Sequence, residues 1–485
     1  MTTAGLRRAW LLVLLVCVFA PLTAEQLPQV VSPTAKQRAL LPNALSLLND
    51  EEPVALFFDM ELYDYTLRSI LDAFPEGTLH AVAMKANPLA ATLLAAKDLG
   101  FGCEVASPCE LEHALQLGFA PEKIVMDSPA KTRRDLRRAL AAGVHLNADN
   151  FEELERIDEI LAADHGGGGR KGLGTCTSTI GMRVNPQYGE GAIAATGTIA
   201  ATSKFGVPLT ELKGDLLERY RRYSWLTAIH CHVGSQGCEL ELLVRGARSV
   251  LDLAREINDL VGARQVATLD LGGGMPVDYA SDADDADAPG RITPARYVDA
   301  LRAAAPELFC GEGDGGGAPP PFSLVTEYGR YASAKCGLMI SKVEYAKSAG
   351  GRRLATVHCG ADLFLRTAYQ PHNWPHRVSA WHPDGSFFDP AGEALDTWDV
   401  VGPLCFRGDI VATGVRLPSA LRSGCAVCVH DAGSYTLAMF SKYNSRQAPP
   451  VYGFRAGGTV VEKISDAETV DEALRMWQMP AAEAM

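Results

Sequence analysis

The chain has 485 residues and carries 58 acidic against 45 basic side chains, so its formal net charge is −13. An acidic protein of this kind is a poor candidate for binding nucleic acid or an anionic membrane surface. Because the chain is long and 47% of it is hydrophobic, we expect two domains, one large and one small, around a sizeable buried core.

Residues 1–24 have the features of a cleavable signal peptide. Two arginines precede an apolar run over residues 9–22, and small residues follow it. That run is shorter than the ~20 residues of a transmembrane helix, so we expect no stable membrane span after cleavage, with a membrane anchor as the alternative. The step Phe19-Ala20-Pro21 is similar to the cleavage motif of bipartite plastid presequences. We therefore predict delivery by the secretory route, ending in a plastid, in the ER lumen or outside the cell.

Between residues 54 and 330, short apolar runs alternate with longer amphipathic ones. The strand-like runs lie at 53–58, 79–85, 102–106, 123–127, 144–149, 179–185, 225–234, 266–274 and 322–329, and the clearest helical runs at 89–100, 108–118, 151–163 and 240–261. Such alternation is typical of a parallel sheet built from βα units. It predicts an α/β protein with a (β/α)₈ TIM barrel over 54–330. A doubly wound sheet is the alternative, but no GxGxxG motif follows the first strand.

After residue 330 the pattern changes to strands separated by turns. The runs at 334–348, 352–360, 396–414 and 424–435 are strand-like, which predicts a β-rich barrel or sandwich domain over 331–460. We expect a strand from within 28–53 to join this domain, and residues 461–485 to form a tail. Insertions near 165 and 310, which are rich in glycine, and near 281, which is rich in aspartate, are expected to be loops without a chemical role. Twelve cysteines are scattered and give no disulfide framework.

Four groups of reactive or flexible residues stand at the ends of predicted barrel strands, where sites form in this fold. They are Lys85; His230, His232 and Ser235; the glycines 272–274; and Glu327 with Arg330. Consecutive glycines allow backbone N–H groups to close on an anion. An amine, an anion loop and a carboxylate together fit pyridoxal phosphate, which has an aldehyde, a phosphate and a ring nitrogen. The two histidines could bind a metal, but no third ligand is evident, so none is predicted.

In this combination the chain resembles the ornithine/diaminopimelate/arginine decarboxylase family, which are pyridoxal-phosphate enzymes with an alanine-racemase-like barrel. The blocks AMKANP, GFGCEVASPCEL, HCHVGSQ, GGGMP, TEYGR, GPLCFRGD and DAGSYT occur in the family's order between about Pro53 and Phe454. Tyr328 stands where the family usually has proline.

The resemblance implies roles for individual residues in pyridoxal 5'-phosphate binding and catalysis. Lys85 would form the Schiff base, which requires a partly neutral amine, and Cys405 would return a proton after carbon dioxide leaves. The implied cofactor-binding residues are Glu104, His232, Ser235, Gly272, Gly273, Gly274, Glu327, Gly329, Arg330 and Tyr435. His232 would stack on the ring, and Glu327 would pair with the pyridine nitrogen. Arg330 would contact the phosphate or a substrate carboxylate, and Glu110 holds the family's second acidic position after Glu104.

The substrate-binding residues implied by the resemblance are Arg330, Arg366, Tyr369, Phe406 and Tyr435. Arg366 and Tyr369 resemble the carboxylate-binding block of the diaminopimelate enzymes, although the block is one residue shorter here. Phe406 stands where the family has an acidic residue that holds the distal amino group of the substrate. The leading prediction is decarboxylation of meso-diaminopimelate to lysine. The alternatives are an ornithine- or arginine-type decarboxylase with an altered clamp, an amino-acid racemase, and a non-catalytic regulatory homologue.

In the family that the chain resembles, the cysteine at the position of Cys405 reaches the active site of the partner subunit. The resemblance therefore implies a homodimer with active sites shared across the interface. A reactive free thiol suits a reducing compartment better than the oxidising lumen that a signal peptide predicts. Delivery through the secretory route into a plastid satisfies both constraints, and lysine synthesis suits that compartment.

Overall fold

The structure is a computed structural model that describes residues 31–165, 176–282, 291–309, 321–388 and 392–478. The predicted signal peptide and most of the three predicted loop insertions lie outside these residues. Among the described residues, no helix is both long and apolar enough to cross a membrane. The ten cysteines in this part of the chain are all free.

Within the described residues, eight parallel strands close into a barrel, in the order β5-β4-β3-β2-β10-β9-β8-β6 with β6 pairing back to β5. The strands are β2 (Leu79–Ala83), β3 (Gly102–Val105), β4 (Ile124–Asp127), β5 (His145–Ala148), β6 (Ile180–Asn185), β8 (Leu226–His230), β9 (Thr268–Asp270) and β10 (Ser323–Tyr328). A two-residue strand, β7 (Val207–Pro208), pairs with β6. The predicted α/β barrel is therefore confirmed.

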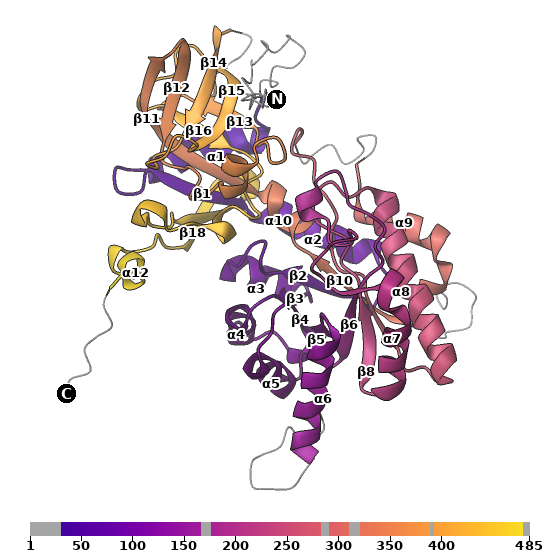
Figure 1. Cartoon of the computed structure of the whole chain (residues 1–485). Helices are drawn as coiled ribbons and strands as arrows, with labels where there is room; N and C mark the ends of the chain where they lie inside the picture. The colour runs from indigo at the N-terminus through magenta and orange to yellow at the C-terminus, as the bar shows by residue number, and fades with distance from the viewer. Residues whose placement is uncertain (1–30, 166–175, 283–290, 310–320, 389–391, 479–485) are drawn as a thin grey trace, which may run out of the picture.

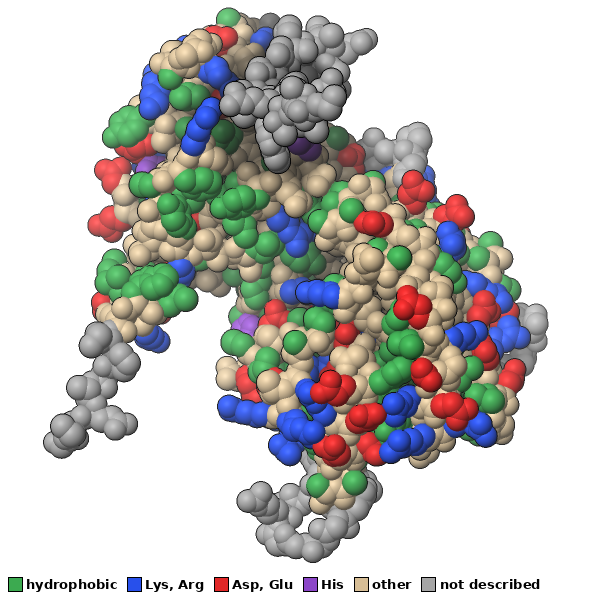
Figure 2. Space-filling model, viewed as in Figure 1, with side chains coloured by type: hydrophobic (Ala, Val, Ile, Leu, Met, Phe, Trp, Pro, Cys, Tyr) green, Lys and Arg blue, Asp and Glu red, His purple; other side chains and the backbone are tan. Residues whose placement is uncertain are grey.

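Helices pack around the outside of this barrel (Figure 1). They are α2 (Met60–Ala73), α3 (Ala90–Asp98), α4 (Pro108–Gln116), α5 (Arg133–Ala142), α6 (Phe151–His165), α7 (Leu209–Arg222), α8 (Leu240–Val261) and α9 (Pro294–Ala304). In α8, Leu243, Ala247 and Val250 are buried at the three- and four-residue spacing that turns one helix face toward the strands. Acidic and basic side chains are interspersed over the visible face of the barrel (Figure 2).

A second, β-rich domain follows the barrel, as predicted. Its main sheet has the order β15-β14-β12-β11-β1-β17-β18, and β13 and β16 pair alongside it. The strands are β1 (Val54–Asp59), β11 (Gly337–Ala349), β12 (Arg352–Val357), β13 (Val378–Trp381), β14 (Leu395–Val401), β15 (Ile410–Pro418), β16 (Ala426–Val429), β17 (Val451–Arg455) and β18 (Val460–Ser465). Short helices α10 (Arg330–Ser333), α11 (Leu365–Tyr369) and α12 (Val470–Arg475) lie between or after these strands.

Three details of the predicted boundaries are wrong. The first strand, β1, pairs with β11 and β17 in the second domain and not with the barrel. The expected strand within 28–53 is instead helix α1 (Ala35–Leu47), which begins with a capping box at Thr34 and buries Leu40 and Leu41. The sheet also continues past residue 460, since β18 pairs with β17. All six residues of β1 are buried, so an unbroken apolar run could have belonged to either sheet.

Candidate active site

The four residue groups predicted to carry chemistry meet at one end of the barrel. Lys85 follows β2, His230 ends β8, the glycines 272–274 follow β9, and Glu327 lies near the end of β10. These four strands are parallel neighbours in the barrel, so their carboxyl ends lie side by side at one end of it. The pocket there is lined by Ala83, Lys85, His232, Gly234, Ser235, Gly274, Met275, Glu327, Tyr328, Gly329, Arg330 and Tyr435.

Lys85 is held by an acidic partner on the neighbouring strand. Its Nζ lies 2.5 Å from Oε2 of Glu104, a side chain that is completely buried. Burial acts to lower the pKa of the Lys85 ammonium, but the charges of Glu104 and Glu327 outweigh burial and raise it above its usual value. Burial also raises the pKa of Glu104, to about 7. Without a bound cofactor the amine is therefore charged, and Glu104 Oε2 is placed to take its proton when Lys85 reacts.

Glu327 is buried beside two histidine rings. Its Oε2 lies 3.8 Å from Nε2 of His230 and 3.7 Å from Nδ1 of His232, and neither carboxylate oxygen has a hydrogen-bond partner. Burial, followed by the charge of Asp270, raises the pKa of Glu327 well above its usual value. Burial also holds the pKa of His232 well below its usual value. His232 is therefore a neutral, flat ring suited to stacking.

Glu327 supplies the third group that the sequence pattern lacked for a metal site, since its carboxylate and the two histidines could together surround one ion. The hydrogen bonds argue against that use. Nδ1 of His232 already accepts from the backbone N–H of Gly273 at 3.0 Å, so its lone pair is engaged. The cluster is better suited to a group that presents a proton or positive charge to Glu327.

The loop after β9 forms a backbone cradle beside these side chains. Gly272 and Gly274 have φ angles of +64° and +102°, which disfavour any other residue. A Cβ atom on Gly273 would lie 2.2 Å from the carbonyl oxygen of Glu327. The close packing of this loop against β10 thus requires glycine, and it leaves backbone atoms rather than side chains facing the pocket.

Two hydrogen bonds hold the guanidinium group of Arg330 beside the pocket. Its Nε donates to Ser235 Oγ at 3.1 Å and its Nη1 to the hydroxyl of Tyr279 at 2.6 Å, while Nη2 is buried without a partner. Sequence reasoning missed Tyr279, because nothing in the local pattern at residue 279 marks it as a neighbour of Arg330.

A second arginine reaches the same place from the β-rich domain. The guanidinium carbons of Arg330 and Arg366 lie 4.6 and 4.5 Å from the ring centre of Tyr435, and 4.5 and 4.9 Å from that of Trp374. Arg366 Nη1 is also buried without a partner. Burial and the charge of Arg330 lower the pKa of Arg366, so an anion between the two would be favourable. Sequence reasoning missed Trp374, because its contacts with the two arginines join distant segments of the chain.

Three predicted residues are not brought into this pocket within one chain. Cys405 is exposed, and its backbone N–H donates to Asn444 Oδ1 at 2.9 Å. The ring of Phe406 stacks on that of Tyr369, with centroids 6.2 Å apart, and meets Tyr443 edge-on at 6.0 Å. Tyr369 is 68% exposed. Tyr369, Phe406 and Tyr443 thus form an aromatic surface, and neither they nor Cys405 line the chain's own pocket.

The residues present fit pyridoxal phosphate. The unpartnered oxygens of Glu327 and the free Nη2 of Arg330 are buried polar atoms that need partners. The N–H groups of Gly272 and Gly273 already donate within the protein, so Gly274 and Ser235 in the lining offer the donors for a phosphate, and Lys85 offers the amine for an aldehyde. Tyr435 and Gly329 complete the lining, and the Tyr435 hydroxyl lies 3.4 Å from where a Cβ of Gly329 would stand.

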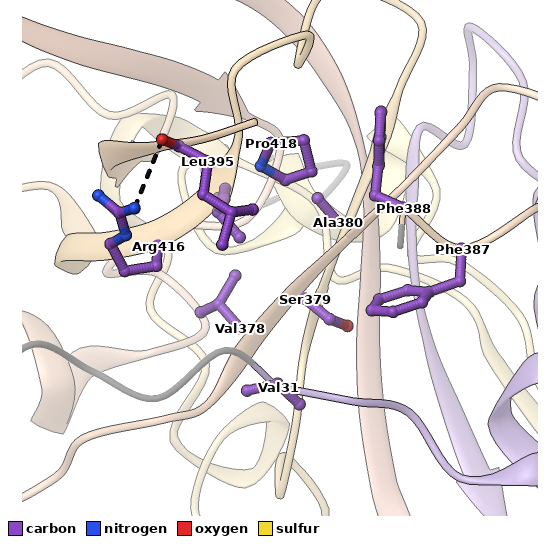
Figure 3. A pocket seen from close by; sticks show the side chains of 10 residues that line it. Val31, Val378, Ser379, Ala380, Phe387, Phe388, Leu395, Arg416 and Pro418 are labelled. Carbon is purple, nitrogen blue, oxygen red and sulfur yellow. Dashed lines mark hydrogen bonds between the residues drawn. The ribbon is translucent and has the colours of Figure 1, made fainter. Parts of the chain in front are cut away.

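Another hollow lies in the β-rich domain and shares none of this chemistry. It is an apolar crevice lined by Val31, Val378, Phe387, Phe388 and neighbouring residues (Figure 3). Its one charged side chain, Arg416, donates to the carbonyl oxygen of Leu395 at 3.5 Å. The crevice has no acid, base or nucleophile among its lining side chains besides Ser379.

Comparison with known proteins agrees with this chemistry. Residues 65–334 match the family described as "Pyridoxal-dependent decarboxylase, pyridoxal binding domain". The chain is 32% identical to the diaminopimelate decarboxylase of Pseudomonas fluorescens, over 78% of this chain and 82% of that protein. It is 28% identical to that of Archaeoglobus fulgidus, over 86% and 91%.

Solved structures share the fold. Diaminopimelate decarboxylase from Helicobacter pylori, complexed with L-lysine, matches with a TM-score of 0.74 at 22% identity, over 90% of this chain and 98% of that one. A lysine/ornithine decarboxylase from Vibrio vulnificus, complexed with putrescine, matches with a TM-score of 0.67 at 19% identity, over 87% and 99%.

The proximity of Glu104 to Lys85 generates a prediction about amine reactivity. In a Glu104→Gln variant the Lys85 ammonium loses its nearest opposing charge, so its pKa should fall by about one unit or more. The cofactor-free variant should then acylate at Lys85 at lower pH than the wild type, as measured by peptide mapping of the labelled protein across a pH series.

Glu110→Gln is the matched control. Glu110 Oε2 accepts from the backbone N–H of Ala106 at 2.6 Å and so supports the start of α4. We expect its removal to leave the pH dependence of Lys85 labelling in place. An unchanged profile in Glu104→Gln, or the same shift in both variants, would contradict the assigned pairing.

Proposed function

Because the chain belongs to the pyridoxal-dependent ornithine, diaminopimelate and arginine decarboxylases, we propose that it decarboxylates meso-diaminopimelate and releases lysine. The protein is a carboxy-lyase of the amino-acid type and uses pyridoxal phosphate. Relatives named diaminopimelate decarboxylase, such as that of Pseudomonas aeruginosa at 31% identity over 84% of this chain, support the diaminopimelate branch.

The pair of guanidinium groups of Arg330 and Arg366 is the observation that carries the substrate assignment. Arg330 and Arg366 each have a buried nitrogen without a hydrogen-bond partner, and both lie against Trp374 and Tyr435. A carboxylate can accept from two such groups at once. Diaminopimelate has a second carboxylate that remains after decarboxylation, whereas ornithine, arginine and lysine have none.

Phe406 removes the acidic contact that the family uses for the distal amino group, in the diaminopimelate enzymes as well as in the ornithine enzymes. A substrate recognised only by a distal ammonium or guanidinium needs an acidic partner there, and Phe406 offers an aromatic ring instead. Ring faces attract cations more weakly than a buried carboxylate does. An ornithine- or arginine-type activity would therefore lose its main recognition element, while a substrate with a distal carboxylate keeps one in the arginine pair.

The roles of the chain's own residues follow from their contacts. Pyridoxal phosphate, when bound, supplies the electron sink that permits loss of carbon dioxide. Lys85 Nζ gives up its proton to Glu104 Oε2 before it can bind the aldehyde carbon. Glu327 would hold the ring nitrogen, and neutral His232 would stack on the ring. Gly274 and Ser235 would hold the phosphate, and Arg366 with Arg330 would orient the substrate. A racemase or a non-catalytic homologue would not need this combination.

The first prediction from this proposal concerns substrate choice. Purified protein should release carbon dioxide from meso-diaminopimelate in preference to ornithine, arginine and lysine. Arg366→Lys should raise KM for meso-diaminopimelate about tenfold or more, because a lysine cannot reproduce the planar two-nitrogen contact.

Arg353→Lys is the control, since Arg353 also lies over a tryptophan, Trp398, at 4.5 Å and pairs with Asp396, outside the pocket. Activity on none of the four amino acids would reject the proposal, and a preference for ornithine would move the chain to the alternative substrate class.

We further propose that the protein acts as a homodimer with shared sites. The exposure of Cys405 and of the aromatic surface of Tyr369, Phe406 and Tyr443 supports this arrangement, because a proton donor outside its own pocket can serve only a neighbour's pocket. Lys85→Ala and Cys405→Ala proteins should each be inactive alone. After mixing and subunit exchange, about one quarter of wild-type activity should return, because half the dimers then hold one intact site.

Size-exclusion chromatography with light scattering would establish the dimer, and carbon dioxide release would measure the recovery. A mixture that exchanges subunits and yet stays inactive would contradict shared sites.

For the compartment, we propose delivery through the secretory route to a plastid. The support is the signal-like residues 1–24 together with a reactive thiol that oxidation would inactivate. A fluorescent protein fused after the first ~60 residues should reach the plastid, as seen by microscopy. Fluorescence in the cytosol or the medium would contradict this route.

A further inference from the structure

A chain of buried hydrogen bonds crosses the barrel interior just below the pocket. Asn147 on β5 donates through Nδ2 both to Asp270 Oδ2 on β9 and to His230 Nδ1 on β8, each at 2.9 Å. All three side chains are fully buried. The other carboxylate oxygen of Asp270 accepts from the backbone N–H of Gly272 at 3.0 Å, so the chain is continuous with the glycine cradle.

The orientation of the Asn147 amide is set by its surroundings. Asp270 is an acceptor of hydrogen bonds, so the group that faces it must be the NH₂ of Asn147 and not the carbonyl oxygen. The Asn147 oxygen points the other way, where Nε2 of His145 lies at 3.1 Å. A Cβ on Gly181 would lie 2.4 Å from that oxygen, so the side chain has little room to turn.

The amide orientation fixes the proton on His230. Because Nδ2 of Asn147 donates to His230 Nδ1, that ring nitrogen must carry a lone pair, and the ring proton must sit on Nε2. Nε2 has no other partner and lies 3.8 Å from Oε2 of Glu327. The nitrogen of His232 that approaches Glu327 accepts from Gly273 and carries no proton. Of the two histidines, only His230 can present an N–H to Glu327.

We propose that Asn147 and His230 are positioning residues, which hold an N–H toward Glu327 and so favour its carboxylate form opposite the ring nitrogen of pyridoxal phosphate. The proposal rests on the cofactor of the proposed function and not on the amino acid decarboxylated. His230 has no other role in the pocket, since the role of stacking on the ring belongs to His232.

The electrostatic surroundings show why such a donor is needed. Glu327 is buried among the carboxylates Asp270, Glu104 and Asp127, which raise its pKa, and the Lys85 charge opposes their effect. Both burial and these like charges favour the protonated acid, which could not pair with a protonated ring nitrogen. A neutral histidine that presents an N–H favours the carboxylate without adding a charge, and burial keeps His230 neutral by lowering its pKa.

The test compares binding of two probes to each protein: pyridoxal phosphate and its deaza analogue, in which CH replaces the ring nitrogen. The variants are His230→Leu, Asn147→Leu and His230→Gln. Glutamine can accept from Asn147 and donate to Glu327, so it retains the arrangement. His80→Leu is the control, because His80 is another buried barrel histidine and its Nδ1 lies 2.7 Å from Thr326 Oγ1.

Dissociation constants from absorbance titration should separate the roles. We expect His230→Leu and Asn147→Leu to weaken binding of pyridoxal phosphate about tenfold relative to the deaza analogue. His230→Gln and His80→Leu should leave that ratio within about twofold of wild type. Both probes are measured on one preparation, so a reduced folded fraction cancels in the ratio. Equal weakening for both probes, or a glutamine variant that behaves like leucine, would overturn the proposal.

Discussion

The ion pair between Lys85 and Glu104 is the contact on which the rest of the pocket depends. Several carboxylates are buried together at the mouth of the barrel, and burying like charges without compensation is costly. The Lys85 ammonium opposes Glu104 directly at 2.5 Å and Glu327 at longer range. Arg183 does the same for Asp127 through a 2.6 Å ion pair, which lowers the pKa of Asp127 despite its burial. When Lys85 gives up its charge to react, Glu104 can accept the proton, so the group of charges stays balanced.

The barrel and its reactive strand ends could be predicted from sequence because both are local patterns. Alternating short and long apolar runs define βα units, and Lys85, the glycine loop and Glu327 follow directly on strand-like runs. Contacts between distant segments were not predictable in this way. Tyr279 reaches Arg330 from the segment after β9, and Trp374 reaches it from the β-rich domain. The wrong placement of β1 has a similar cause, since a fully buried strand does not indicate which sheet will bury it.

Helix α1 shows a different limit of sequence reasoning. Pro42 lies inside this helix, and proline ordinarily argues against a helix interior. Its packing against Phe57 and Phe454 of the second domain outweighs that local cost. The hydrogen bonds among polar side chains inside the barrel also could not be predicted from sequence patterns. Asn147 lies in a short strand-like run, and its partners Asp270 and His230 are supplied by strands more than eighty residues away.

The location of β1 has a consequence for the order in which the protein can assemble. This strand precedes the barrel in the chain, yet it lies between β11 and β17, and the register pairs Phe58 with Gly453. The barrel is thus an insertion within the β-rich domain and is built from one continuous stretch. During synthesis the barrel can close before the β-rich domain is complete, because β17, the partner of β1, emerges almost four hundred residues after β1. Such distant pairing is slow to form, so completion of the second domain is a late event in the maturation of the pocket that both domains line.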